Sequence, residues 1–375
     1  MKKLAALFLL IALGAVGAVG VFLARSRKPY RGYTGAEQFV DIPAGSGTSA
    51  IGARLMAAGV VRDMWTYKAA LWISGRARGL KAGEYRFDQA LTPAQVIDKI
   101  ARGDVYYVSL TIPEGLTIAD VAAIVEAHGF GPAASFVEAA KDVSLVRALD
   151  PTATDLEGYL FPETYMLSRH VSASTIVRLM VDRFDHVFGA DLREAAAARG
   201  LSVRQVVTLA SIVEKETARP DERPLIAAVY TTRLRIGMPL QCDPTVIFAL
   251  QRAHRYDGHI HKADLSFDSP YNTYRYPGLP PGPIAAPGKG SLDAAVHPAD
   301  ADFLYFVSRN DGTHAFARTL EEHNRNVQKY QVQYFRDQRA GRAGEASGAG
   351  EGGRAGTGGA AGAEARTRHA GRSNR

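Results

Sequence analysis

The sequence predicts an α+β protein with two folded regions, 36–149 and 150–336, behind an apolar N-terminal helix and ahead of a disordered tail. Three observations predict this organisation. Residues 4–24 carry no charge, a strand–turn–helix pattern occurs twice in the first half, and helical periodicity dominates the second half. We expect the second region to be mainly helical, with long loops and a few short strands.

The N-terminal run 4–24 is rich in Leu, Ala, Val and Gly. A helix needs about 20 such residues to cross a bilayer, whereas the apolar part of a cleaved signal peptide has about 7–15. We therefore expect an uncleaved anchor within residues 1–31, with a short cytoplasmic tip and a basic flank. Charge does not set its orientation, because basic residues stand on both sides of the run.

The formal net charge of +7 gathers at the two ends of the chain, in 1–31 and 337–375. The part between them is close to neutral and has no basic stripe, so we expect no nucleic-acid partner. Cys242 is the single cysteine, which excludes an internal disulfide. His259, His261 and Asp264 could be imagined as metal ligands, but an exposed His-x-His loop without further ligand spacing predicts no metal site. We expect no cofactor.

The first region contains an internal repeat. Six positions recur at a constant offset of 70 residues, each with an identical or similar residue: Ile42, Pro43, Gly45, Ile51, Leu55 and Gly59. In both copies an extended segment meets a Pro-Gly turn and an amphipathic helix follows. Gly59 and Gly129 stand where a helix end favours a left-handed residue. Between the copies, 81–87 predicts a turn into a strand and 93–100 a helix that opens at Pro93.

The second region is predicted to contain helices at 175–188, 202–217 and 222–236, and a buried strand at 304–307. The stretch 267–290 is crowded with Pro and Gly and predicts a long loop. The tail, 337–375, has almost no large apolar residue. It cannot bury enough surface to offset the entropy of ordering, so we expect it to be disordered.

Glu214 continues the apolar stripe of the helix predicted at 202–217. Val203, Val207, Ala210 and Glu214 are spaced so that they fall on one face. Burial there disfavours the charged form of a carboxylate, as a general acid requires. Glu216 should point elsewhere. Spacing alone fits equally a helix-end glutamate paired with Arg or Lys.

Two polar segments follow that helix. Asp243 and Pro244 form a good helix start, with Asp243 as the N-cap. Segment 269–275 offers amides, hydroxyls and aromatic rings without excess charge. Such a surface suits a neutral sugar, although a packed Tyr-rich loop has the same composition.

These residues lie in motifs that resemble the MltG-type (YceG-like) endolytic murein transglycosylases over roughly residues 36–335. The motifs are LEGYLFPETY (156–165), LASIVEKET (209–217), DPTV (243–246), SPYNTY (269–274), GLPPGPI (278–284) and EHN (322–324). Cys242 departs from the family's usual Ser or Thr, and Ala286 stands where the family often has Asn.

The resemblance implies a LysM-like module in the first region and a catalytic domain in the second. It implies a single-pass protein of the inner (cytoplasmic) membrane, with its body on the periplasmic side. The implied reaction is non-hydrolytic cleavage of the MurNAc–GlcNAc β-1,4 bond, which leaves 1,6-anhydro-MurNAc ends. The family's essential glutamate is the first Glu of the VEKET motif, here Glu214. The implied partners are peptidoglycan strands and penicillin-binding synthases, and the implied role is terminating or trimming nascent strands.

Candidate saccharide contacts under this hypothesis are polar or aromatic residues near the motifs: Gln241, Asp243, Tyr271, Asn272, Tyr274 and Glu163. Glu157 and Glu163 are interpreted as structural or substrate-orienting. Two alternatives stay open. A hydrolytic muramidase would use Glu214 with Asp243 or Glu163, because glycoside hydrolases normally need two carboxylates. A membrane-tethered, non-catalytic peptidoglycan-binding scaffold would bind strands without cutting them.

Overall fold

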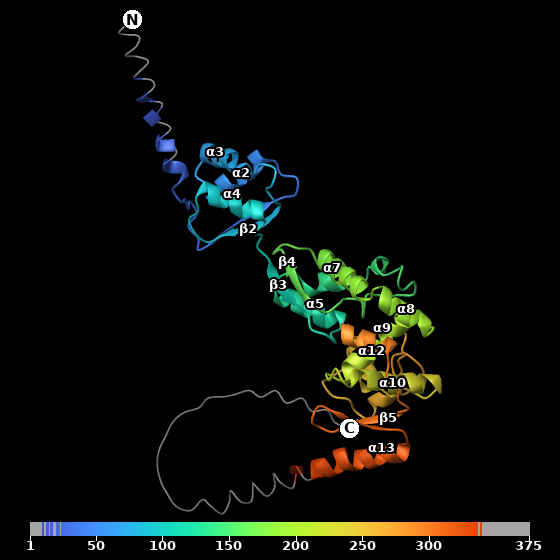
Figure 1. Cartoon of the computed structure of the whole chain (residues 1–375). Helices are drawn as coiled ribbons and strands as arrows, with labels where there is room; N and C mark the ends of the chain where they lie inside the picture. The colour runs from blue at the N-terminus through green and yellow to red at the C-terminus, as the bar shows by residue number, and fades with distance from the viewer. Residues whose placement is uncertain are drawn as a thin grey trace, which may run out of the picture. The chain divides into compact units, whose positions relative to one another are not determined.

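The computed structural model describes residues 10, 13–14, 16–17, 20–22, 24–336 and 338–339. The chain divides into two compact units (Figure 1). Unit 1 comprises 1–110 and 165–171, and unit 2 comprises 111–164 and 172–375. The mixed α+β class expected from the sequence is confirmed, with helices predominating over short strands.

Unit 1 is built on one pair of antiparallel strands that lie on either side of two helices in the sequence. Its strands pair so that Val40 faces Tyr85. Alternate residues of the two strands are buried together with the apolar faces of three helices, and they form one core that includes Leu55 and Ile97. The Tyr85 hydroxyl lies inside this core and donates to the carbonyl oxygens of Lys81 and Ile100. The elements are β1 (Gln38–Ile42), α2 (Thr48–Ala57), α3 (Met64–Ser74), β2 (Gly83–Phe87) and α4 (Pro93–Arg102).

The repeat predicted from the sequence is present as two turn–helix units. Both turn glycines, Gly45 and Gly115, have positive φ, at 78° and 75°. The helix-ending Gly59 and Gly129 also have positive φ, at 69° and 77°, as expected for residues just beyond a helix C-terminus. The first copy belongs to unit 1 and the second, from Thr111 onwards, to unit 2.

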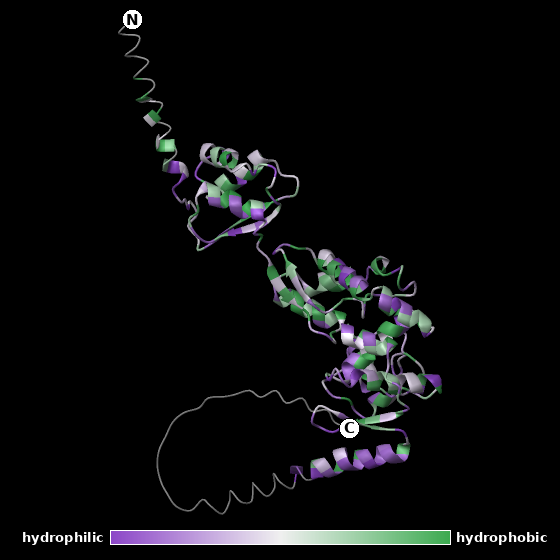
Figure 2. Ribbon diagram, viewed as in Figure 1, coloured by the Kyte–Doolittle hydropathy of each residue, from purple (hydrophilic) through white to green (hydrophobic). Residues whose placement is uncertain are grey.

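Unit 2 is mainly helical, and α9 lies at its centre, packed against α8, α10, α11 and α12. The helices predicted at 175–188, 202–217 and 222–236 are confirmed within two residues at each end. Figure 2 shows that the last helix, α13, is largely hydrophilic. The helices are α5 (Ile118–Ala127), α6 (Ala133–Ala139), α7 (Ala173–Val187), α8 (Ala190–Ala198), α9 (Val203–Glu216), α10 (Arg223–Arg235), α11 (Asp243–Arg252), α12 (Lys289–Val296) and α13 (Leu320–Val327).

Two short ribbons complete the fold. Strand β3 (Val108–Thr111) pairs with β4 (Thr164–Leu167), and the division between the units passes through both strands. Strand β5 (Tyr305–Ser308) pairs with β6 (His314–Ala317). The strand predicted at 304–307 is therefore present. Its residues are only half-buried, because β5 stands in a two-stranded ribbon with no sheet on either side.

Three expectations differ from the structure or lie outside it. The units divide before Thr111 and not near residue 150, because the second repeat copy packs with the helices that follow it. Most of the run 4–24, and nearly all of the tail 337–375, lie outside the described residues. None of the helices in the part of the chain that the structure describes has the length and apolar character needed to cross a bilayer.

Unit 1 includes an ion pair between distant parts of the sequence in which the carboxylate is buried and the arginine is partly exposed. The Glu84 side chain on β2 is 7% exposed and accepts from Arg169 Nε and Nη2 at 3.1 and 2.6 Å. The hydrogen bonds from Arg169 outweigh burial and hold the pKa of Glu84 below its usual value. The guanidinium also lies 3.4 Å from the centre of the Phe39 ring. Segment 165–171 is thereby joined to both strands, β1 through Phe39 and β2 through Glu84.

Replacing Arg169 by alanine should destabilise unit 1 by about 2–4 kcal/mol, because Glu84 would keep a buried charge without its partner. Hydrogen exchange of the β2 amides in increasing urea measures this cost. Arg183→Ala is the matched control, since it removes an exposed pair with Glu163 and should cost less than about 1 kcal/mol. Equal costs for the two variants would contradict the assigned role of Arg169.

Candidate active site

Helix α9 positions the candidate acid. Ser202 caps its first turn, and the Gln205 side chain reciprocates in a capping box. The apolar face of the helix, including Val206, Val207 and Ala210, is buried. Glu214 lies in the last turn, and its side chain is only 6% exposed. The stripe predicted from the sequence therefore places this carboxylate at the edge of the core.

Both Glu214 oxygens have a hydrogen-bond donor. Arg223 Nη2 donates to Oε1 at 3.0 Å, and the Gly288 backbone N–H donates to Oε2 at 3.0 Å. The interpretation as a helix-end glutamate paired with arginine is thus confirmed geometrically. It does not exclude a catalytic role, because the paired carboxylate still faces a pocket. That pocket has a volume of about 480 Å³. It is lined by Glu114, Gly115, Leu116, Glu214, Lys215, Thr217, Ala218 and Arg223.

Arg223 is held in place by the turn between α9 and α10. The buried Glu222 just before it accepts from the His314 backbone N–H at 2.8 Å, and its Oε2 lies 2.7 Å from His314 Nδ1. Thr217 Oγ1 lies 3.4 Å from Glu222 Oε2 and accepts from the Arg219 N–H at 3.0 Å. These contacts fix the turn, and with it the distance between the carboxylate of Glu214 and the guanidinium of Arg223.

A second carboxylate, Glu114, meets the same guanidinium. Arg223 Nη2 lies 3.1 Å from Glu114 Oε2. Burial raises the pKa of Glu114, and the charge of Glu214 raises it further, while Arg223 partly offsets both. The sequence pattern did not single out Glu114, because it lies in the second repeat copy, 100 residues before Glu214, and no local pattern links the two. The one available signal was the acidic residue inside the second Pro-x-Gly turn.

Backbone contacts anchor the turn that carries Glu114. The Gly115 N–H donates to the Ala286 carbonyl, and the Ala286 N–H donates to the Leu116 carbonyl, both at 2.8 Å. Lys215 Nζ donates to the Gly115 carbonyl at 3.0 Å. Ala286, a departure from the family pattern, is buried and makes these contacts through its backbone, which any residue other than proline could supply.

The Pro-rich segment 278–288 runs beside α9. Arg204 Nη1 donates to the Pro281 carbonyl at 2.6 Å, and the Ile284 N–H donates to Ser211 Oγ at 3.0 Å. The Gly288 N–H reaches Glu214, as described above. The loop predicted at 267–290 is therefore ordered, and it delivers a backbone donor to the candidate acid.

None of the six predicted saccharide contacts lines the pocket beside Glu214. Asn272 is fully buried, its Nδ2 donates to two carbonyls of its own loop, and its Oδ1 accepts from the Tyr274 N–H. The Tyr274 hydroxyl donates to Asp243 at 2.6 Å. Asp243 was expected to cap α11, but Cys242 is the N-cap residue and no side chain caps this helix.

The other candidates lie in different surroundings. Tyr271 packs on Phe248, with ring centres 4.9 Å apart. Gln241 has a positive φ of 51°, and its N–H donates to the Thr273 carbonyl. Glu163 pairs with Arg183 at the surface. Contact between these side chains and a saccharide stays a prediction.

Glu216 turns away from Glu214, as the helical spacing predicts. The Tyr230 hydroxyl donates to it at 2.6 Å, and burial raises its pKa. Cys242 lies in the same buried cluster, where burial raises the pKa of its thiol far above the usual value. This cluster therefore belongs to the packing between α9, α10 and α11.

Glu157 is a buried carboxylate with a structural contact. Its two oxygens lie 3.3 and 3.2 Å from the Ile118 N–H at the start of α5. Burial raises its pKa to about 8, so it is largely protonated at neutral pH. It does not line the pocket.

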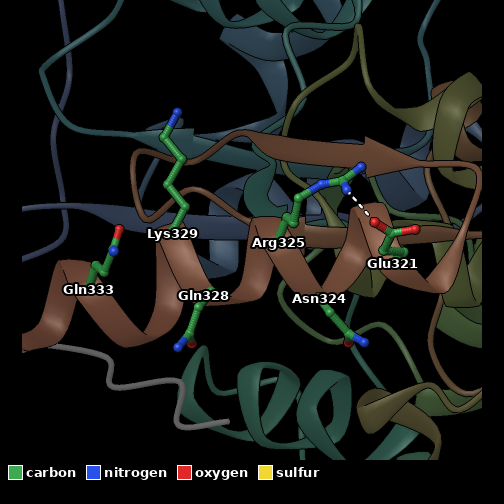
Figure 3. Close-up of a pocket in the computed structure, with 6 residues that line it drawn as sticks. All are labelled: Glu321, Asn324, Arg325, Gln328, Lys329 and Gln333. Atoms are coloured by element: carbon green, nitrogen blue, oxygen red, sulfur yellow. Dashed lines mark hydrogen bonds and ion pairs between the residues drawn. The ribbon is translucent and has the colours of Figure 1, made fainter.

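The histidine loop at 259–264 and a hollow along α13 do not form a second candidate active site. In the described residues, no group of three or more His, Cys, Asp or Glu gathers as metal ligands. His261 instead lies 3.0 Å from Asp257. A hollow of about 510 Å³ lies along α13 (Figure 3). Its lining residues come from one helical stretch, and Glu321 pairs with Arg325 across one turn.

The family model described as "YceG-like family" matches residues 40–329. The chain belongs to the YceG-like family. It is 32% identical, over 78% of its length and 84% of the relative's, to a Bacillus subtilis protein named endolytic murein transglycosylase. A Streptococcus pneumoniae protein of the same name is 28% identical, over 78% of this chain and 58% of the relative. The crystal structure of the yceG-like protein lmo1499 from Listeria monocytogenes aligns with a TM-score of 0.54 at 34% identity. That alignment covers 77% of this chain and 98% of the other.

In this YceG-like chain, Glu157→Gln should increase stability more at high pH than at low pH. The folded pKa of about 8 lies above the usual 4.5. The wild-type carboxyl therefore costs nothing below about pH 4.5 and becomes progressively destabilising as pH rises toward 8. Between about pH 4.5 and pH 8 the variant should gain about 4 kcal/mol of stability relative to wild type, as measured by urea unfolding across pH. Glu138→Gln, an exposed change beside Lys141, should show no such trend. A pH-independent effect of Glu157→Gln would contradict the buried protonated carboxyl.

Proposed function

We propose that this chain is an endolytic murein transglycosylase that cleaves the MurNAc–GlcNAc β-1,4 bond without water, with Glu214 as acid and base. The observation that carries the proposal is the placement of Glu214 at the wall of a pocket, nearly buried, with a donor on each oxygen. The names of the Bacillus and Streptococcus relatives support the same reaction.

The chemistry requires one carboxyl group that acts twice. Protonated Glu214 donates to the leaving oxygen as the glycosidic bond breaks. The resulting carboxylate accepts the proton of the muramyl 6-hydroxyl, whose oxygen bonds to C1 and closes the 1,6-anhydro ring. Arg223 and the Gly288 N–H stabilise the carboxylate formed between these steps, because both are already aimed at its oxygens. The nucleophile belongs to the substrate, so no water needs to be positioned.

The muramidase alternative requires a second carboxylate with room for water or for attack at C1. Asp243 is bonded to Tyr274 and Glu163 to Arg183, and neither lines the pocket. The geometry therefore favours the single-carboxylate reaction over a hydrolase built on those residues.

The proposal extends to location and partners. The uncharged run 4–24 supports an anchor in the inner membrane, and a peptidoglycan substrate requires the body on the periplasmic side. The strand–turn–helix organisation of the first region supports a LysM-like glycan-binding module. Termination or trimming of nascent strands beside penicillin-binding synthases follows as the proposed role.

Peptidoglycan digestion with the purified chain tests the reaction. The wild type should release fragments with 1,6-anhydro-MurNAc ends, as identified by mass spectrometry. Glu214→Gln should lower their release by about 10³-fold, because the amide can neither donate nor accept the transferred proton. Glu138→Gln, a matched change at an exposed residue that does not line the pocket, should leave the release intact.

Three outcomes would contradict the proposal. Fragments with reducing ends would identify a hydrolase. Undiminished release by Glu214→Gln would remove that residue from the chemistry. Strand binding by the wild type without any cleavage would favour the scaffold alternative.

A further inference from the structure

Two carboxylates in the pocket share one guanidinium. Glu214 Oε1 and Glu114 Oε2 lie 3.0 and 3.1 Å from the same nitrogen, Arg223 Nη2. If both were ionised, one positive charge would face two negative ones. The other cation at the pocket wall, Lys215, donates to the Gly115 carbonyl, whereas the ion pairs of Glu114 and Glu214 are both made with Arg223. The remaining lining residues are uncharged.

Arg223 cannot easily move to relieve this imbalance. Its side chain is 12% exposed, and it occupies the first position of α10 behind the fixed turn 217–222. Its Nε is buried and has no hydrogen-bond partner in the described part of the chain. The guanidinium is thus confined beside the two carboxylates at some cost in hydrogen bonding.

The fold does not require an acidic residue at position 114. The first repeat copy makes the same Pro-x-Gly turn, with Gly45 at nearly the same φ as Gly115, and has Ala44 at the equivalent position. A turn of this kind therefore forms without a carboxylate. The role of Glu114 is to be sought in what its side chain contacts.

The backbone opposite Glu114 leaves room for that side chain. A Cβ on Gly288 would collide with Glu114 Oε1, so this carboxylate closely approaches the Gly288 backbone. Gly288 is also the residue whose N–H donates to Glu214. One glycine thus allows both carboxylates to gather beside Arg223.

We propose that Glu114 is a positioning residue that shares a single proton with Glu214 over Arg223, and that it thereby keeps Glu214 able to act as the acid. The inference rests on the proposed transglycosylase function. It is supported by electrostatics as well as geometry, since two like charges in one site favour the uptake of a proton by one of them. Burial and then the charge of Glu214 raise the pKa of Glu114, which is the direction that favours a proton on this carboxyl.

The proton balance closes over one reaction cycle. In the proposed cycle the proton starts on Glu114, while the Glu214 oxygens accept from Arg223 and Gly288. Transfer of the proton to Glu214 leaves Glu114 as the anion beside Arg223. Glu214 then gives that proton to the departing oxygen and regains one from the muramyl 6-hydroxyl. The pair ends with the one proton it began with.

The pH dependence of Glu114→Gln tests this role. Without the second negative charge, Arg223 acts on Glu214 alone and favours its ionised form. The alkaline limb of kcat/KM for the release of anhydro-ended fragments should move at least about one pH unit lower. Activity at pH 7 should fall about 10-fold and recover to within about twofold of wild type near pH 5.

Further variants separate this role from a structural one. Gly288→Ala keeps the N–H but displaces the Glu114 carboxylate. The alkaline limb of its kcat/KM profile should therefore also move to lower pH. Glu114→Asp keeps the second negative charge and should keep the wild-type limb even if its rate falls. Glu138→Gln should change neither. Thermal unfolding verifies that each variant is folded.

The outcomes distinguish a failure of the proposed transglycosylase function from a failure of the shared proton alone. Inactive wild type, or full activity in Glu214→Gln, would overturn the proposed function itself. With an active wild type and an inactive Glu214→Gln, an equal loss at every pH in Glu114→Gln and Gly288→Ala would overturn only the shared proton. It would then assign Glu114 to structure.

Discussion

The hydrogen bonds between α9 and segment 278–288 are the constraint on which the site depends. Proline-rich backbone has few N–H groups, so such a segment gains little order from secondary structure. Here Arg204 contacts Pro281, Ser211 contacts Ile284 and Glu214 contacts Gly288. The contacts therefore follow the same order along the helix and along the segment. The helix that presents the candidate acid therefore also orders the segment that supplies the donor to this acid. The same helix, α9, contributes buried side chains to the core and Glu214 to the site, so a change that disturbs one should disturb the other.

A carboxylate beside an arginine is ordinarily a poor proton donor, since the cation favours its ionised form. In the proposed site a second carboxylate from a distant turn, Glu114, contacts the same arginine and offsets this effect on Glu214. Either carboxylate alone beside Arg223 would form an ordinary ion pair. Their chemistry follows from two carboxylates that meet one guanidinium in a space that is partly removed from water. Preorganised donors from Arg223 and Gly288 complete the arrangement without any movement of the backbone.

Local patterns predicted most of the helices, because caps, apolar stripes and glycine ends are written into contiguous residues. They also led to Glu214. They could not predict Glu114, which meets Arg223 across 109 residues of sequence. Composition suggested that Asn272 and Tyr274 face a sugar, yet their polar atoms bond within their own region. Composition does not reveal which partner a polar group finds. The division at Thr111 was hidden for the same reason, since a repeat looks like one module in sequence even when its copies join different units.

Unit 1 is discontinuous in sequence, because segment 165–171 returns to it after the chain has entered unit 2. That segment brings Arg169 to the buried Glu84. A fragment that ends at Leu110 would expose the open side of β3 and leave a carboxylate without its cation inside the core. Gene fusions or domain exchanges cut at this point would therefore inherit an incomplete module. During synthesis, too, the ribosome releases the last piece of unit 1 only after about 60 further residues, so the second repeat copy is made before unit 1 is complete.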